Sequence, residues 1–179
     1  LGTKGQKVVA VDQTCIGIGE YQEISTGEDG TVAEDVDIDA TSEEGVVATL
    51  RIPKGVKAFD KDGNPLAEIG ISAIPVDQLT SPGKAIIVSG CAFDLQPDGA
   101  TFDPAITLTF DISQDVWNRL NLDKNNLEVK WYNKDTGKWE DIPTTVDKTK
   151  KEVSAKITHF STFALFEVPK PTKPPSGGG

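Results

Sequence analysis

Apolar and polar residues alternate along most of this chain, a pattern that indicates β-strands with one buried face and one exposed face. The clearest run extends from Ile106 to Ile112, where every second residue is apolar and the residues between are two threonines and an aspartate. Similar alternation predicts strands at 36–40, 48–52, 69–73, 127–131 and 153–166. Two short strands, 85–88 and 92–95, are predicted on either side of Gly90.

Turn-forming residues separate these strands. The segments Asp60 to Pro65 and Pro97 to Gly99 carry the Asp, Pro and Gly residues that tight turns prefer. Ser113 is the predicted N-cap of one short helix, which we expect to end near Leu120. Short strands, frequent turns and one brief helix predict an all-β fold, and the expected architecture is an antiparallel β-sandwich.

Acidic residues are concentrated near the N-terminus and give the chain a net charge of -10. Ten of them fall between Glu20 and Glu44, a stretch without Lys or Arg, and the remaining 18 acidic residues equal the 18 Lys and Arg residues in number. A chain with this balance is not expected to bind nucleic acid or an anionic membrane surface. The acidic stretch favours a solvated face over a calcium site, so no metal site is predicted.

Composition divides the chain into three predicted parts. Residues 1–45 form an acidic N-terminal extension that is partly strand, residues 46–168 form the sandwich, and residues 169–179 form a Pro/Gly-rich linker. We expect the linker to join the sandwich to a further part of a longer protein. No apolar run approaches the roughly 18 residues that cross a bilayer, so no membrane insertion is expected from this segment.

Cys15 and Cys91 are far apart in sequence and do not have the spacing of a metal or redox motif. In an oxidising compartment they would pair and stabilise the fold by about 2–4 kcal/mol. The alternative is two buried free thiols, and the residues alone favour neither interpretation.

Three short motifs follow one another through the rest of the chain. They are Leu50-Arg51-Ile52-Pro53-Lys54-Gly55, the segment from Phe93 to Leu108, and the closing run Thr158-His159-Phe160-Ser161-Thr162-Phe163. In this order they resemble the strand motifs of ZU5-like domains on microbial extracellular proteins. The resemblance covers roughly Val46 to Phe166 and does not extend to the first 45 residues.

The resemblance implies a β-sandwich that connects or presents other domains outside the cell or at its surface. Its partners would be other domains or subunits of a surface assembly, and neither an external substrate nor a cofactor is expected. Some proteins with a His-Phe-Ser motif cleave their own chain between Phe and Ser. Here the break would fall between Phe160 and Ser161, with Ser161 as nucleophile and His159 as general base.

Counting along the predicted strand 153–166 supports a structural interpretation of the same motif. Alternation places Ile157, His159 and Ser161 on one face. Residues two apart on a regular strand are separated by about 7 Å, too far for a His-Ser hydrogen bond unless a bulge intervenes. We therefore favour a motif whose polar side chains satisfy backbone groups, and we retain self-cleavage as the second hypothesis.

Other enzyme chemistry finds little support among the residues. The chain has one histidine and two separated cysteines, and it lacks a Gly-x-Ser-x-Gly motif, so neither a Ser-His-Asp hydrolase nor a zinc site is predicted. Trp131 and Trp139 fit the core pattern, which leaves little of an aromatic platform for sugars.

Two further functions stay open. In the first, residues 1–45 leave the sandwich and a strand such as Lys7 to Ile18 completes the sheet of a neighbouring copy, which would build a surface filament or layer. In the second, the chain is a carbohydrate- or calcium-binding adhesion module.

Overall fold

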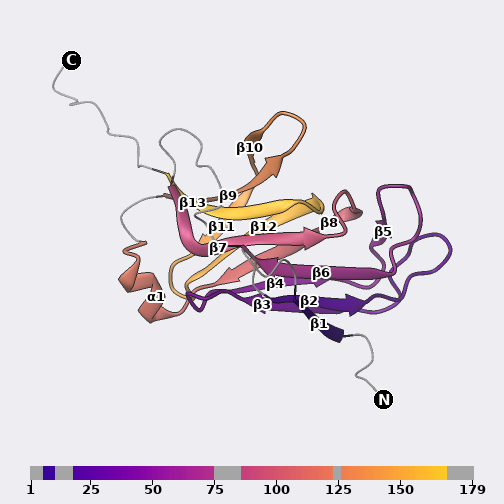
Figure 1. Cartoon of the computed structure of the whole chain (residues 1–179), viewed down its shortest axis with the longest axis horizontal. Helices are drawn as coiled ribbons and strands as arrows, with labels where there is room; N and C mark the ends of the chain where they lie inside the picture. The colour runs from indigo at the N-terminus through magenta and orange to yellow at the C-terminus, as the bar shows by residue number, and fades with distance from the viewer. Residues whose placement is uncertain (1–5, 11–17, 75–85, 123–125, 169–179) are drawn as a thin grey trace.

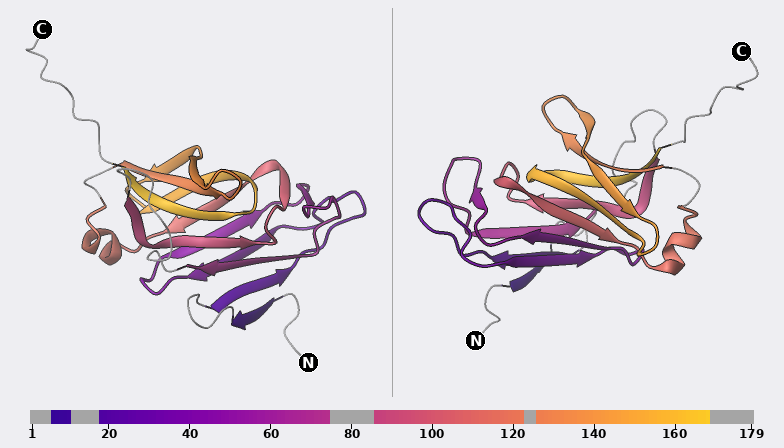
Figure 2. Two further views of the ribbon diagram at one scale, coloured as in Figure 1. Left: turned by 45° about the horizontal axis from the view of Figure 1, so that its top comes forward. Right: turned by 180° about the vertical axis from the view of Figure 1, so that it is seen from behind.

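The computed structural model describes residues 6–10, 18–74, 86–122 and 126–168. Within these residues the chain forms two antiparallel sheets packed face to face, with a short helix at one end (Figure 1; Figure 2). The strands are β1 (Gln6–Ala10), β2 (Ile18–Glu23), β3 (Val36–Thr41), β4 (Val47–Ile52), β5 (Lys57–Phe59), β6 (Glu68–Ala73), β7 (Ile86–Gln96), β8 (Thr101–Asp111), β9 (Asn126–Asn133), β10 (Lys138–Asp141), β11 (Thr144–Asp147), β12 (Glu152–His159) and β13 (Thr162–Val168), and the helix is α1 (Gln114–Arg119). The predicted all-β sandwich with one short helix is confirmed.

Both sheets pair strands that are distant in sequence. The seven-stranded sheet has the order β1-β2-β6-β7-β13-β9-β10. The six-stranded sheet has the order β11-β12-β8-β4-β3, with β5 paired to β8 beside this path. The last strand, β13, therefore lies in the middle of the larger sheet, antiparallel to β7 on one side and to β9 on the other.

The central strand β8 follows the predicted alternation. Its Leu108 and Phe110 are wholly buried, whereas Thr107 and Thr109 are partly exposed. The ring centroid of Phe110 lies 5.8 Å from that of Phe93 on β7, a contact that spans the space between the two sheets. Burial of such side chains is the main stabilising contribution to a sandwich core.

The segment around Gly90 differs from its prediction. Residues Ile86–Gln96 form one long, curved strand instead of two short ones (Figure 1). Its pairing with β13 changes register between Ala164 and Phe166, so β7 carries extra residues there. A glycine in such a bulge leaves room for the bend, and the strand continues through it instead of ending.

A second apolar cluster lies on the seven-stranded sheet, separate from the main core. It contains Ile87, Ala92, Ala164 and Phe166, all buried. Trp139 of β10 packs against it, with its ring 5.0 Å from that of Phe166. The central strand β13 is consequently buried on both of its faces.

The acidic stretch contributes strands to both sheets. β2 pairs with β1 and β6 in the larger sheet, and β3 forms an edge of the smaller one. On β3, Val36, Ile38 and Ala40 are buried, and Asp37 and Asp39 are exposed, as the alternation predicted. The predicted linker, 169–179, lies outside the described residues.

Ion pairs offset part of the acidic charge. Arg51 on β4 pairs with Asp35 at 3.2 Å and with Asp37 at 2.7 Å, and Arg119 on α1 pairs with Glu44 at 2.8 Å. All these side chains are about a third or more exposed, so solvent screens the pairs and each adds little to stability.

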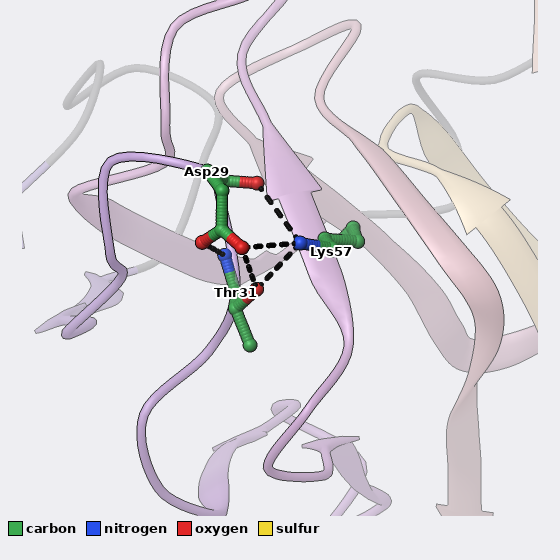
Figure 3. A network of polar contacts seen from close by, with 3 residues as sticks. All are labelled: Asp29, Thr31 and Lys57. Carbon is green, nitrogen blue, oxygen red and sulfur yellow. Dashed lines mark hydrogen bonds and ion pairs between the residues drawn. The ribbon is translucent and has the colours of Figure 1, made fainter.

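One polar network fastens the loop between β2 and β3 to β5 (Figure 3). Nζ of Lys57 donates to Oδ2 of Asp29 at 2.6 Å and to Oγ1 of Thr31 at 2.7 Å, and the Thr31 hydroxyl donates to the same carboxylate at 2.9 Å. The hydrogen bond from Lys57 is the main reason that the pKa of Asp29 lies well below its usual range. Gly30 is required in this loop because its φ is +80° and a Cβ would stand 2.3 Å from the ring of Phe59.

The helix α1 begins where the sequence predicts. The Ser113 side chain caps it by accepting a hydrogen bond from the Val116 N–H at 3.2 Å. Trp117 on α1 is completely buried, whereas Trp131 and Trp139, which the sequence placed in the core, are only partly buried. Alternation reveals which face a strand residue occupies but not how near it lies to the rim of the sheet. No helix in the described residues is long and apolar enough to span a membrane.

The alternation on β8 predicts a large contrast between neighbouring alanine substitutions. Leu108→Ala should lower the free energy of unfolding by about 2–5 kcal/mol, because it leaves a cavity between the sheets. Thr109→Ala, on the outer face, should cost no more than about 1 kcal/mol. Urea unfolding of the two variants measures both values, and similar losses would contradict the assignment of faces.

Candidate functional site

The His159-Phe160-Ser161 motif lies where the chain passes from one sheet to the other. β12 ends at His159 in the six-stranded sheet, and β13 begins at Thr162 in the seven-stranded sheet. Phe160 and Ser161 alone connect them, and we refer to these two residues as the crossover. The predicted continuous strand 153–166 is therefore wrong at this point.

The change of sheet explains why the strand prediction failed. Alternation along β12 buries Val153, Ala155 and Ile157, but every residue from Phe160 to Glu167 is buried. A segment that runs between two sheets and then along a strand covered on both faces has no exposed side. Counting every second residue thus cannot be carried across the crossover.

The turn between β7 and β8 holds the crossover through backbone hydrogen bonds. The Phe160 N–H donates to the Ala100 carbonyl at 2.9 Å, and the Gly99 N–H donates to the Phe160 carbonyl at 3.1 Å. The Leu95 N–H, near the end of β7, donates to the Ser161 carbonyl at 3.0 Å. These bonds satisfy polar groups that would otherwise be buried without partners.

The side chains of the crossover are also engaged. The ring of Phe160 packs 4.7 Å from that of Phe102, measured between centroids. Ser161 is 4 % exposed, and its hydroxyl donates to the backbone carbonyl of Tyr132 on β9 at 2.9 Å. Through this bond Ser161 ties the crossover to a strand on the side opposite the β7–β8 turn.

His159 packs among aromatic rings. Its ring lies 4.3 Å from that of Trp131, edge to face, and 6.0 Å from that of Phe163. Its Nε2 is buried and has no hydrogen-bond partner in the described structure. Burial lowers the pKa of His159, and the charges of Asp98 and Glu140 oppose this shift only in part.

Self-cleavage would require a bulge between His159 and Ser161. The pairing of β12 with β8 changes register earlier, between Ile157 and His159, and the extra residues there belong to β8. Within the described residues no hydrogen bond joins His159 to Ser161, whose hydroxyl donates to the Tyr132 carbonyl. A peptide carbonyl is too weak a base to take the proton of that hydroxyl. In the described arrangement the Ser161 hydroxyl therefore contacts no base that would activate it as a nucleophile.

Next to the crossover lies a carboxyl group that the sequence reasoning missed. Asp94 on β7 accepts hydrogen bonds from the hydroxyl of Thr162 at 3.0 Å and from the side-chain amide of Gln96. Burial raises the pKa of Asp94, although the two hydrogen bonds act in the opposite direction. The signal was present, because Asp94 and Gln96 alternate with the buried Phe93 and Leu95 and so share the other face of β7.

Other candidate residues do not gather into a site. Among the described residues, no group of three or more His, Cys, Asp or Glu side chains is placed to hold a metal ion. A shallow depression beside β9 contains two carboxylates, Glu128 and Asp141, and both pair with Lys130. Carboxylates held in this way by an ammonium group do not resemble an acid-base pair for hydrolysis.

Only one of the two cysteines is described. Cys91 lies on β7 and is wholly buried, and burial raises the pKa of its thiol well above the usual range. It is therefore a poor nucleophile at neutral pH. Cys15 lies outside the described residues, so its pairing with Cys91 stays a prediction.

Comparison with known proteins adds no family. No protein-family model matches the chain, and no curated protein matches it. What the structure establishes of the ZU5-like resemblance is the β-sandwich of two antiparallel sheets.

The half-buried carboxyl group of Asp94 leads to a prediction about pH. Because the pKa of Asp94 is raised in the folded state, its ionised form opposes folding near neutral pH, and stability from this group should increase as the pH falls toward the unfolded value of 3.8. Asp94→Asn removes the charge and keeps an oxygen acceptor for Thr162. The variant should be at least as stable as the native protein near neutral pH, and its advantage should shrink on acidification.

Urea unfolding at a series of pH values measures this difference. Asp39→Asn, on the exposed face of β3, is the matched control and should not reproduce the change with pH. A variant that is clearly less stable than the native protein at neutral pH would show that the charge of Asp94 supports the fold.

Proposed function

We propose that this chain is a structural module of an extracellular or cell-surface assembly, which connects or presents other domains and does not act on an external substrate. The observation that carries the proposal is the crossover itself. The Phe160 backbone, the Ser161 carbonyl and the Ser161 hydroxyl all make internal hydrogen bonds, which suits a joint between sheets. The extracellular setting and the partners rest on the resemblance of the motifs from Leu50 to Phe163 to ZU5-like domains.

The arrangement of the first and last strands supports a connecting role. β1 and the end of β13 lie on opposite sides of the molecule in all three views (Figure 1; Figure 2). A module of this kind passes the chain from one side to the other. The last strand is paired along both edges, with β7 and β9, so a pull on its end would have to break two ladders at once.

Self-cleavage is the second candidate, and one contact favours it. The Gly99 N–H that binds the Phe160 carbonyl could also stabilise an oxyanion on that oxygen. Oγ of Ser161 would attack the Phe160 carbonyl carbon, and its proton would pass through His159 to the Ser161 nitrogen as the C–N bond breaks. Water would then hydrolyse the ester to a Phe160 carboxylate and the Ser161 hydroxyl.

Mass spectrometry of the denatured protein tests the two candidates. We expect a single intact mass, because the Ser161 hydroxyl is engaged by Tyr132 instead of by a base. Ser161→Ala should leave the mass pattern unchanged and lower the free energy of unfolding by about 0.5–1.5 kcal/mol through loss of that bond. Ser154→Ala, on a half-buried position of β12, is the matched control and should cost less.

Self-cleavage would give a different set of results. The sample would contain two fragments that separate only on denaturation, with the break after Phe160. Ser161→Ala would abolish them, Ser161→Cys would retain them, and His159→Ala would slow their formation by about 10²–10⁴-fold. This outcome would replace the structural proposal with an autoproteolytic one.

The remaining alternatives stay predictions. Light scattering of the purified chain tests strand exchange. Strand exchange predicts polymers, whereas a connecting module should be a monomer. Glycan binding with and without a chelator tests the adhesion alternative.

A further inference from the structure

His159 is poorly suited to carry a charge. Its Nε2 atom is buried without a hydrogen-bond partner in the described structure, and the rings of Trp131 and Phe163 lie beside it. A neutral imidazole can leave this nitrogen unprotonated against aromatic surface at modest cost. An imidazolium would carry a second N–H on this nitrogen, and that N–H would have no acceptor in the described structure.

The position of His159 gives this chemistry a mechanical consequence. It is the last residue of β12, and the crossover follows it directly. His159 pairs with β8 in its own sheet, next to a change of register, and its ring contacts Trp131 of β9 in the other sheet. It therefore links the two sheets at this point. A change at His159 therefore acts on the hydrogen bonds of Phe160 and Ser161 before it acts on the rest of the sandwich.

We propose that His159 is an acid-sensitive latch: the neutral ring holds the crossover closed, and protonation loosens the junction between the two sheets. The inference rests on the structural role of the crossover proposed above, and it adds regulation by acidity to that role.

The charged groups around His159 oppose the latch without cancelling it. Asp98, in the turn between β7 and β8, and Glu140, on β10, both favour the charged ring. Asp98 already pairs with Lys134 at 3.5 Å, and Glu140 accepts a hydrogen bond from Asn133 at 2.5 Å. Three uncharged residues also lie beside His159 in the described structure: Phe163 on β13, Trp131 on β9, and Thr101, which is opposite His159 on β8.

The direction of the pH effect follows from which state binds the proton. Above the ordinary histidine pKa of 6.5 both the folded and the unfolded chain keep the ring neutral, and the latch is closed. Below pH 6.5 the unfolded chain binds a proton at His159 more readily than the folded chain does, because burial lowers the pKa of His159 in the fold. The equilibrium for opening then rises by up to about tenfold per pH unit until the folded ring also titrates.

Nuclear magnetic resonance tests the latch directly, because His159 is the one histidine of the chain and its imidazole signals need no assignment among others. Titration of the intact protein should place the midpoint below 6.5. A midpoint at or above that value would overturn the proposal.

Hydrogen exchange measures the mechanical consequence. The amides of Leu95, Gly99 and Phe160 make the bonds that close the crossover, so their protection factors should fall by up to about fivefold between about pH 6.5 and 5.5. Protection in the centre of β4 and β8 should change less over this interval. Equal changes everywhere would mean that no local latch exists.

Three variants complete the test. His159→Phe keeps an aromatic ring without a titrating group and should remove the extra loss of protection. His159→Gln also removes the titrating group and replaces this variant if the larger Phe ring disturbs folding. Glu140→Gln removes a charge that favours the proton and should deepen the loss on acidification. A native-like pH response in both His159 variants would reject the latch, whereas cleavage products in the mass spectrum would reject the structural role itself.

Discussion

A chain that passes between two packed sheets must bury its peptide groups, and buried peptide groups need hydrogen-bond partners. The two-residue crossover at Phe160 and Ser161 meets this requirement with partners that lie far away in sequence. The β7–β8 turn and the end of β7 supply three backbone bonds, and β9 supplies the acceptor for the Ser161 hydroxyl. The relative position of the two sheets on this side of the molecule depends on these contacts.

This dependence explains what could be predicted from the sequence. Alternation identified β3, β4, β8 and β9 correctly because each has one face that is more deeply buried than the other. It could not detect the crossover, because a face pattern does not say which sheet a strand joins. The prediction of two short strands around Gly90 failed for a similar reason. A glycine is typical of both a strand end and a bulge, and only the pairing of β7 with β13 decides between them.

The candidate site shows the same limit at the level of chemistry. The motif His159-Phe160-Ser161 was visible in the sequence, but its meaning depends on Gly99, Ala100 and Tyr132, which no local pattern connects to it. Two of these partners engage the motif through backbone carbonyl groups and the third through a backbone N–H, so their side-chain identities carried no signal. The sequence left Ser161 with two interpretations, a partner for a backbone group or a nucleophile, and in the fold its hydroxyl donates to the Tyr132 carbonyl.

The central place of β13 has a consequence for how the protein is made. Without residues 162–168 the larger sheet consists of two separate pieces, β1-β2-β6-β7 and β9-β10, with the edges of β7 and β9 unpaired. During synthesis on the ribosome these edges stay unpaired until β13 has emerged, since β13 is the last of the described strands in chain order. The sandwich must therefore close late and through contacts of long sequence separation, which makes folding slow and leaves β7 and β9 open to pairing with other chains in the interval.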